Sequence, residues 1–283
     1  MYPAPFDYVR PSTLDEAVAL LAQHGDEAKV LAGGHSLIPA MKLRLASPKV
    51  LVDIGCVAGL SYIQEVGGRI AIGAMATHGD IEASALLRDR CPLLPETAAH
   101  IGDPQVRNKG TVGGSLAHSD PAADWPAAIL ALDAELEIAG RDGRRTVRAD
   151  AFFVDLLQTV IGPDEILCEI RMAPTPRSVA YVKTDQKASG FALTGVAVVV
   201  PHGGSGVRVG VTGVAAKAYR ALAVERALAA HKAITPATIA LAAAHAADGV
   251  DALGDIHASP EYRMHLAEVN TRRALTRALE RMG

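Results

Sequence analysis

Cysteine is scarce in this chain, and its spacing excludes a metal cluster held by the chain alone. The 283 residues include only Cys56, Cys91 and Cys168, and no two of them form a CxxC or similar pair. Iron–sulfur clusters and structural zinc sites need cysteines a few residues apart. We expect the three residues to be small buried hydrophobes in a reducing compartment.

Export signals and long apolar runs are also missing. The start, Met-Tyr-Pro-Ala-Pro, lacks the charged and apolar regions of a signal peptide, so we expect a cytoplasmic protein. The most apolar run, Phe191 to Pro201, is too short to span a bilayer and is interrupted by Gly195. It is better interpreted as a buried strand, and we expect no membrane insertion.

An excess of positive charge is absent too. The formal net charge is -3 and the pI is about 6.4, which removes the electrostatic case for a nucleic-acid partner. The closest approach to a basic cluster is Arg144, Arg145 and Arg148, which are too few to neutralise many phosphates. We interpret it as a solvated hairpin.

Two glycine pairs stand out among the predicted helices and strands. Residues 12–25 have the pattern of a helix with Ser12 as N-cap and Gly25 at its end. A strand at 29–32 then runs into Gly33-Gly34, and residues 37–45 have helical spacing. The second pair, Gly113-Gly114, precedes an apolar helix at 125–132, so the plan of strand, glycine turn and helix is predicted twice.

The remaining pattern indicates an α+β protein of three subdomains, residues 1–58, 59–175 and 176–283. Pro174 and Pro176 mark the second boundary, because neither can continue a strand ladder. A long helix is predicted at 261–282. Further expected strands are 50–54, 61–66, 69–72, 136–139, 145–148, 166–172, 179–183, 192–200 and 207–214, and further helices are 81–88, 94–100 and 151–157.

The first glycine pair has the chemistry of an anion site. Gly33 and Gly34 can adopt backbone angles closed to other residues and carry no β-carbon, so amide hydrogens can converge on an anion. Ser36 adds a hydroxyl, and the helix that follows adds the positive end of its dipole. This is the outline of a pyrophosphate cradle, although glycine pairs are also common in plain turns.

Thr111 and Ser115 bracket the second pair, Gly113 and Gly114, with hydroxyl donors. Two uncharged donor loops suit a dinucleotide diphosphate better than a nucleoside triphosphate, which normally brings a lysine and a magnesium ligand. Neither loop matches GxxxxGK[ST] or GxGxxG.

The flanking residues carry a family resemblance. The strings AGGHSLIPAMKLRLASP (residues 32–48) and DPQVRNKGTVGGSLAHSDPAADWPA (residues 103–127) resemble the two flavin-binding segments of the medium subunit of carbon monoxide dehydrogenases and related molybdenum hydroxylases of the xanthine dehydrogenase type. The resemblance covers essentially the whole chain. It implies a p-cresol methylhydroxylase-type FAD-binding fold followed by a C-terminal α+β subdomain of the carbon monoxide dehydrogenase flavoprotein type.

The same resemblance implies a cofactor and partners. FAD is expected to bind non-covalently between the first two subdomains. A small subunit with two [2Fe–2S] clusters and a large subunit with molybdopterin are the expected partners, in a dimer of heterotrimers. The chain would relay electrons from the clusters to a quinone, NAD or oxygen, with no catalytic residue or metal ligand of its own.

Carried over by position, the resemblance assigns twelve residues to FAD. Asp124 would bond the ribityl chain, and Phe191 stands where an aromatic residue, usually tyrosine, lies near the flavin ring. The diphosphate would be held by Ala32, Gly33, Gly34, His35, Ser36 and Leu37 from the first loop, and by Thr111, Gly113, Gly114 and Ser115 from the second.

Several of these residues have alternative interpretations. Asp124 could instead cap the helix that starts at Trp125, and Phe191 could be an ordinary core residue. Some flavoproteins of the wider fold attach FAD covalently through histidine, but in the resembling subunits the flavin is not covalently held, so we interpret His35 as shaping the loop or facing phosphate. His100 and His118 are interpreted as ordinary polar residues, because no second ligand stands at metal spacing from either.

Three other functions are possible alternatives to this one. A self-sufficient FAD oxidase or dehydrogenase would need a substrate domain, and the residues after Pro176 are too few and too rich in alanine for one. A scaffold protein that has lost the flavin is disfavoured by the intact glycine loops. A hydrolase triad of Ser115, His118 and Asp120 is disfavoured because six consecutive residues cannot easily place nucleophile, base and orienting acid in a chain.

Overall fold

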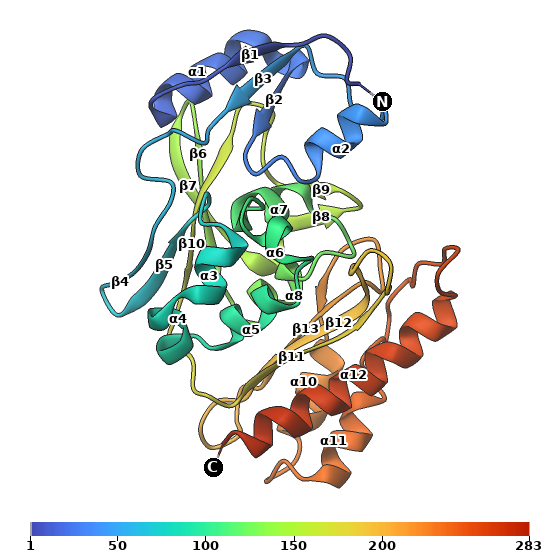
Figure 1. Ribbon diagram of the computed structural model, residues 1–283. Helices are drawn as coiled ribbons and strands as arrows, with labels where there is room; N and C mark the ends of the chain where they lie inside the picture. The colour runs from blue at the N-terminus through green and yellow to red at the C-terminus, as the bar shows by residue number, and fades with distance from the viewer. Residues whose placement is uncertain (1, 283) are drawn as a thin grey trace.

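The computed structural model describes residues 2–282 and contains three larger sheets, each with its own helices (Figure 1). Met1 and Gly283, the outermost residues of the expected first and third subdomains, lie outside the described residues. The mixture of helices with mainly antiparallel sheets confirms the α+β class.

The N-terminal sheet has three parallel strands in the order β1 (Asp7–Val9), β3 (Val50–Asp53), β2 (Ala28–Leu31). Helix α1 (Leu14–His24) packs on it, and η1 (Gly25–Glu27) leads into β2. Gly25 ends α1 as predicted, but Thr13 is the N-cap in place of Ser12. The Thr13 hydroxyl accepts from the amide of Glu16, whereas the Ser12 amide and hydroxyl bind the Glu16 carboxylate.

The middle sheet is antiparallel, with β10 (Ile166–Met172) at its centre. The order is β4 (Ile63–Val66), β5 (Arg69–Gly73), β10, β6 (Glu135–Gly140), β7 (Gly143–Arg148). The β6–β7 hairpin carries Arg144, Arg145 and Arg148, which are exposed and ion-paired, so the solvated hairpin is confirmed.

Short helices gather beside the middle sheet and share its largest core (Figure 1). The predicted helix 81–88 is wrong, because Ser84 ends α3 and caps α4. The predicted helix 151–157 is also wrong, because the chain turns into the β8–β9 hairpin after one helical turn. The elements are α3 (His78–Ala83), α4 (Ala85–Arg90), α5 (Leu93–Ala99), α6 (Pro104–Arg107), α7 (Val112–His118), α8 (Trp125–Ala131), α9 (Ala149–Phe152), β8 (Phe153–Asp155) and β9 (Gln158–Thr159).

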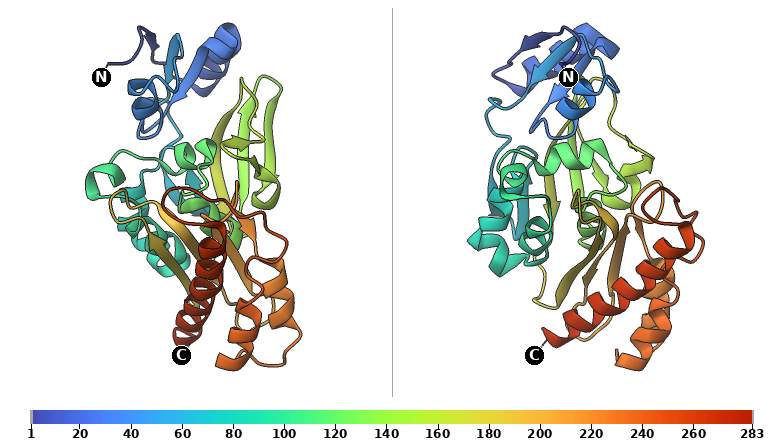
Figure 2. Two further views of the ribbon diagram at one scale, coloured as in Figure 1. Left: turned by 90° about the vertical axis from the view of Figure 1, so that its right-hand side faces the viewer. Right: turned by 45° about the vertical axis from the view of Figure 1, so that its right-hand side comes forward.

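The C-terminal sheet is buried on both faces. Its antiparallel order is β11 (Val179–Asp185), β12 (Ala192–Val199), β13 (Arg208–Thr212), β14 (Tyr219–Arg220). Helices α10 (Leu222–Ala229), α11 (Pro236–Ala243) and α12 (Pro260–Glu280) cover one face (Figure 2), and α8 packs against β12 and β13.

Side chains along β11 show how this sheet joins the rest. Val179 and Tyr181 belong to the core shared with the middle sheet, whereas Ala180 and Val182 belong to the core under the C-terminal helices. This alternation is the period of two expected for a strand. Gly210 lies so close to α8 that a β-carbon there would be 2.0 Å from the carbonyl oxygen of Ala127.

The apolar run that begins at Phe191 forms the buried strand β12, as predicted. Among residues 2–282, no helix is both long enough and apolar enough to cross a membrane.

Candidate functional site

The first glycine loop leaves a run of backbone donors unused. It connects β2 to α2 (Leu37–Lys42), and Gly34 takes a left-handed φ of 75° that favours glycine. None of the N–H groups of residues 32–37 donates a hydrogen bond to any part of the described chain. The His35 ring nitrogen Nδ1 lies 3.0 Å from the Gly33 carbonyl oxygen, which fits the loop-shaping interpretation.

The second glycine pair is built differently from the first. Gly113 and Gly114 lie in the first turn of α7, and their amides are already bonded, to the Ala74 carbonyl at 2.9 Å and to the Thr111 hydroxyl at 3.1 Å. Thr111 is the N-cap of α7 and forms an isolated bridge with Thr77. The expected repeat of strand, glycine turn and helix is therefore wrong here, since a bridge precedes the pair in place of a strand.

The two glycine segments approach each other so closely that no side chain fits between their backbones. A β-carbon on Gly33 would lie 2.2 Å from the Lys109 carbonyl oxygen and 2.9 Å from the Gly110 α-carbon. A β-carbon on Gly114 would lie 2.8 Å from the Thr111 hydroxyl and 3.4 Å from the Ala32 β-carbon. The structure thus brings the first glycine loop against the segment that leads into the second pair, although the loop follows a strand of the N-terminal sheet and the pair begins helix α7.

Hydroxyl groups add donors next to the free amides. Ser36 is exposed, has no side-chain capping bond, and stands at the start of α2, while Ser115 is half-buried on α7. The buried Thr111 hydroxyl accepts one bond from Gly114 and can still donate one. Uncharged donors on a backbone without obstructing side chains suit a diphosphate.

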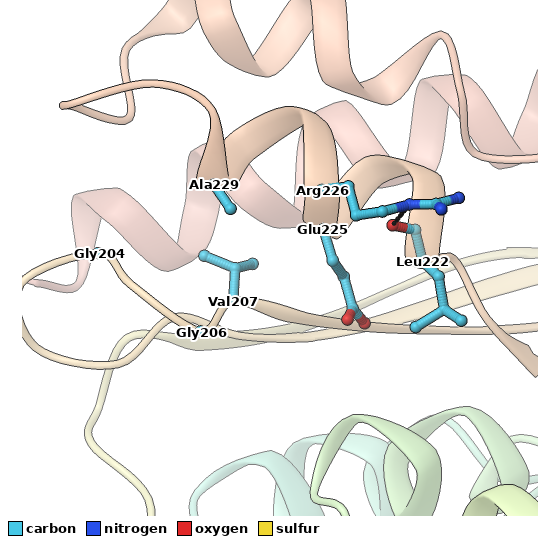
Figure 3. A pocket seen from close by; sticks show the side chains of 7 residues that line it. All are labelled: Gly204, Gly206, Val207, Leu222, Glu225, Arg226 and Ala229. Atoms are coloured by element: carbon cyan, nitrogen blue, oxygen red, sulfur yellow. Dashed lines mark hydrogen bonds between the residues drawn. The ribbon is translucent and has the colours of Figure 1, made fainter.

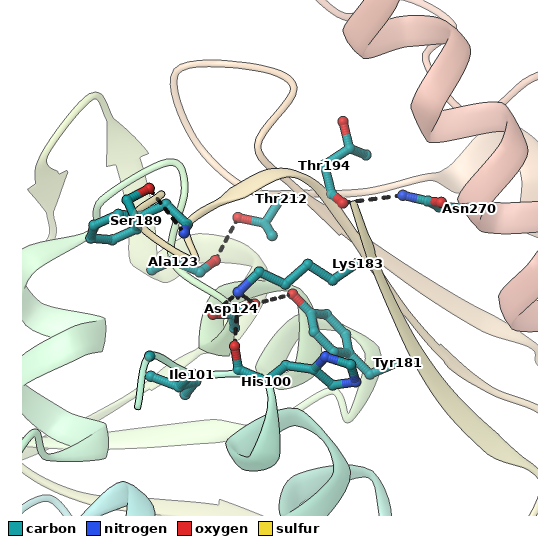
Figure 4. A network of polar contacts seen from close by, with 12 residues as sticks. His100, Ile101, Ala123, Asp124, Tyr181, Lys183, Ser189, Thr194, Thr212 and Asn270 are labelled. Carbon is teal, nitrogen blue, oxygen red and sulfur yellow. Dashed lines mark hydrogen bonds and ion pairs between the residues drawn. The ribbon is translucent and has the colours of Figure 1, made fainter. Parts of the chain in front are cut away.

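Asp124 lies in a buried network with the C-terminal sheet (Figure 4). Its carboxylate accepts from the Tyr181 hydroxyl at 2.5 Å and from the Lys183 ammonium at 2.8 Å. Lys183 also donates to the His100 carbonyl at 2.9 Å, and its side chain is only 3% exposed. Each donor of the ammonium group can therefore be satisfied inside the protein.

The alternative role of Asp124 as a helix cap is wrong. It occupies the N-cap position of α8, but its side chain makes no capping hydrogen bond because both oxygens are turned to β11. Burial raises the pKa of Asp124, while Lys183 and Tyr181 oppose this rise by stabilising the ionised carboxylate.

Phe191 is 51% exposed, so its interpretation as a core residue is wrong. It ends the loop between β11 and β12, which is closed by the Gln186 amide bonded to the Phe191 carbonyl at 2.8 Å. The next residue, Ala192, donates its amide to the Ala122 carbonyl at 3.1 Å, two residues before Asp124.

Among residues 2–282, no three His, Cys, Asp or Glu side chains are grouped as metal ligands. An open pocket of about 330 Å³ lies between residues 204–207 and α10 (Figure 3). The carboxylate of Glu225, which lines it, is engaged by Arg220 and the Val209 amide.

Sequence reasoning missed Lys183, Tyr181 and His78. The alternation of Val179, Tyr181 and Lys183 along one strand could have indicated that the lysine stem lies on a buried face. His78 begins α3 and accepts a hydrogen bond from the Trp125 indole at 3.0 Å. Nothing in its local sequence distinguishes it from a surface histidine.

Removing Lys183 should destabilise the fold strongly. Lys183→Met leaves the buried Asp124 carboxylate without its countercharge, so we expect a loss of about 3 to 5 kcal/mol in the free energy of unfolding at pH 7. The variant should raise the pKa of Asp124 further, so its folded state takes up a proton more readily than the unfolded chain. The deficit relative to wild type should therefore shrink as the pH falls from 7 to 5, as measured by urea unfolding.

Lys49→Met is the matched control, because Lys49 pairs with Glu27 but is 71% exposed and should contribute little. Equal, small effects of both substitutions would contradict a structural role for the Asp124–Lys183 pair.

Comparison with known proteins agrees with this geometry. Residues 4–175 match the model of the FAD binding domain in molybdopterin dehydrogenase, and residues 179–278 match the CO dehydrogenase flavoprotein C-terminal domain. The carbon monoxide dehydrogenase medium chain of Hydrogenophaga pseudoflava is 40% identical over 99% of both chains. The nicotine 6-hydroxylase medium subunit of Paenarthrobacter nicotinovorans is 36% identical over 96% of both.

Solved structures give the same result. A chain of the Hydrogenophaga pseudoflava carbon monoxide dehydrogenase superposes with a TM-score of 0.96 at 41% identity, covering 99% of each chain. A chain of quinoline 2-oxidoreductase from Pseudomonas putida 86 gives a TM-score of 0.93 at 31% identity and covers both chains fully. This chain therefore belongs to the family of FAD-binding medium subunits of carbon monoxide dehydrogenases and related molybdenum hydroxylases.

Proposed function

We propose that the chain holds the diphosphate of FAD between residues 32–37 and 111–115 and passes electrons from an iron–sulfur partner to an external acceptor. The observation that carries this proposal is the bare-backbone contact at Gly33, which gathers unused amides and hydroxyls at one place. When bound, the flavin supplies reversible electron transfer, and the protein binds and orients it.

The predicted residues divide into two roles in this proposal. Residues 32–37 offer free amides, and the hydroxyls of Ser36, Thr111 and Ser115 offer further donors. Gly113 and Gly114 contribute close packing, since their amides are already bonded.

Asp124 and Phe191 are proposed to approach the flavin from the side of the C-terminal sheet. Asp124 keeps acceptor capacity, because each carboxylate oxygen has two lone pairs and only two side chains donate to it. Exposure of the Phe191 ring leaves it available to a planar ligand.

The same three subdomains, residues 1–58, 59–175 and 176–283, are proposed as the working parts of the chain. In support, Pro174 and Pro176 separate β10 of the middle sheet from β11 of the C-terminal sheet, and the two matched family models end and begin at residues 175 and 179.

FAD is proposed to bind without a covalent bond. The Nδ1 atom of His35 is engaged with its own loop, which supports a structural role for the ring. Acid precipitation of the purified protein should release all yellow colour into the supernatant, as measured by absorbance near the flavin maximum. Flavin that stays on the denatured polypeptide would show covalent attachment instead.

A single methyl group at Gly33 should weaken FAD binding. In Gly33→Ala the new β-carbon meets the Lys109 carbonyl at 2.2 Å, so the two segments must move apart. We expect binding at least about tenfold weaker, a change of roughly 1.4 kcal/mol, with circular dichroism unchanged. Titration with FAD, followed by flavin fluorescence, measures the effect.

Gly67→Ala is the control for this experiment. Gly67 lies in the β4–β5 turn, has a left-handed φ of 58° and has open space around its β-carbon position. Gly67→Ala adds the same methyl group away from the site without any contact, and it also carries a backbone strain that Gly33→Ala does not. If Gly33→Ala bound FAD as tightly as the wild type, the contact of Gly33 with residues 109–110 would be a structural turn with no part in FAD binding.

Partner subunits are proposed to supply the electrons. The relatives are medium chains or subunits by name, and the cysteine spacing of this chain does not suit a cluster. Large apolar side chains near the first loop are strongly exposed, Leu43 at 60% and Leu45 at 80%, as expected of a surface that another subunit covers.

Native purification should therefore recover this chain with a small [2Fe–2S] subunit and a large molybdopterin subunit, as a dimer of heterotrimers. Metal analysis and mass measurement of the purified complex test this. A homogeneous, active oxidase that contains FAD but no iron, no molybdenum and no second polypeptide would favour the self-sufficient oxidase.

A further inference from the structure

His78 is a buried histidine next to the glycine segments. It is 5% exposed and begins α3. The Trp125 indole N–H donates to its Nδ1 atom at 3.0 Å, with the two ring centres 5.8 Å apart. Because an indole nitrogen can only donate, Nδ1 must be the unprotonated nitrogen, and the neutral ring carries its proton on Nε2.

The other side of the ring packs on the backbone that supports the first loop. A β-carbon on Gly110 would lie 2.6 Å from Nε2 of His78, and the His78 amide donates to the Gly110 carbonyl at 2.9 Å. Lys109 and Gly110 are in turn the backbone against which Gly33 rests. A continuous stack therefore runs from Trp125 through His78 and Gly110 to Gly33.

The surroundings of His78 oppose a positive charge. Burial, and then the nearby His35 and Arg107, lower the pKa of His78 to about 4. The carboxylates on its own helix are engaged elsewhere, Glu82 with Arg107 at 2.6 Å and Asp80 with Thr77. Protonation would place a hydrogen on Nδ1 directly opposite the Trp125 N–H, so this bond could not persist.

We propose that His78 is a positioning residue for FAD, whose neutral imidazole, fixed by Trp125, holds residues 109–110 against the first glycine loop. This inference rests on the proposed FAD function and extends it to a residue that need not touch the cofactor. FAD retention should depend on an unprotonated Nδ1.

The sign of the pH effect follows from the lowered pKa. A solvated histidine takes up a proton near pH 6.5, whereas His78 in the closed stack does so only near 4. Between these values, protons favour any state in which the stack is open. The closed stack is therefore fully favoured above pH 6.5 and is progressively lost as the pH falls toward 4.

Trp125 provides a direct readout, because it is the only tryptophan of the chain. Tryptophan emission and bound FAD are measured on the same samples of the full chain between pH 7 and 4, with circular dichroism to verify folding. In the wild type, emission should change and FAD should dissociate together over this range.

Two substitutions separate positioning from space filling. In His78→Asn the amide oxygen can accept the Trp125 N–H but cannot be protonated, so FAD binding at pH 7 should be retained and its acid-dependent loss removed. In His78→Phe the ring volume stays but the acceptor is gone, so FAD should bind about tenfold more weakly at pH 7. His231→Asn, an exposed control just beyond the end of α10, should keep the wild-type profile.

Three outcomes would overturn the inference alone while the wild type still binds FAD. These are an unchanged acid profile in His78→Asn, wild-type affinity in His78→Phe, or removal of the acid dependence by His35→Asn and not by His78→Asn. A wild-type chain that binds no FAD at pH 7 would overturn the proposed function together with this inference.

Discussion

The contact of bare backbone at Gly33 is the constraint on which the site depends. The first loop leaves the N-terminal sheet and the second segment lies beside the middle sheet, so neither can form the site alone. They approach until a β-carbon on Gly33 would be 2.2 Å from a carbonyl oxygen. Any side chain at this position would separate them, which explains why glycine is needed at a residue whose φ angle is not left-handed.

Hydrogen bonds join the C-terminal sheet to the segment that precedes Asp124. Thr212 donates its hydroxyl to the carbonyls of Pro121 and Ala123, and the amides of Ala192 and Gly213 bond to Ala122 and Pro121. The segment that precedes Asp124 is thus fixed by residues that lie between 70 and 92 positions later in the sequence. The buried Asp124–Lys183 pair adds specificity to this junction, since a misplaced partner would leave a charge unpaired in the core.

The sequence predicts local features of the fold well and the roles of particular atoms poorly. Strand β10 and helix α12 were predicted to within one or two residues, because apolar periodicity and proline punctuation are local signals. The Gly113-Gly114 pair was found but its setting was misinterpreted, since the Gly113 amide is bonded to the carbonyl of Ala74, far away in the sequence. Asp124 was likewise found, but its pairing with Lys183 depends on how two sheets meet.

A comparison of His35 with His78 shows why composition and motifs alone do not reveal the role of a residue. His35 stands in the first glycine loop, is exposed, and bonds only to the carbonyl of Gly33. His78 stands in an unremarked segment, yet it is buried between Trp125 and Gly110 and is held neutral by that burial. The sequence shows whether a histidine lies inside a motif. It does not show the protonation state of that histidine, because this is set by the groups that the folded chain packs around the ring. The two glycine segments therefore offer amides and hydroxyls, His78 beside them is kept neutral by burial, and the Asp124–Lys183 pair is buried against the C-terminal sheet.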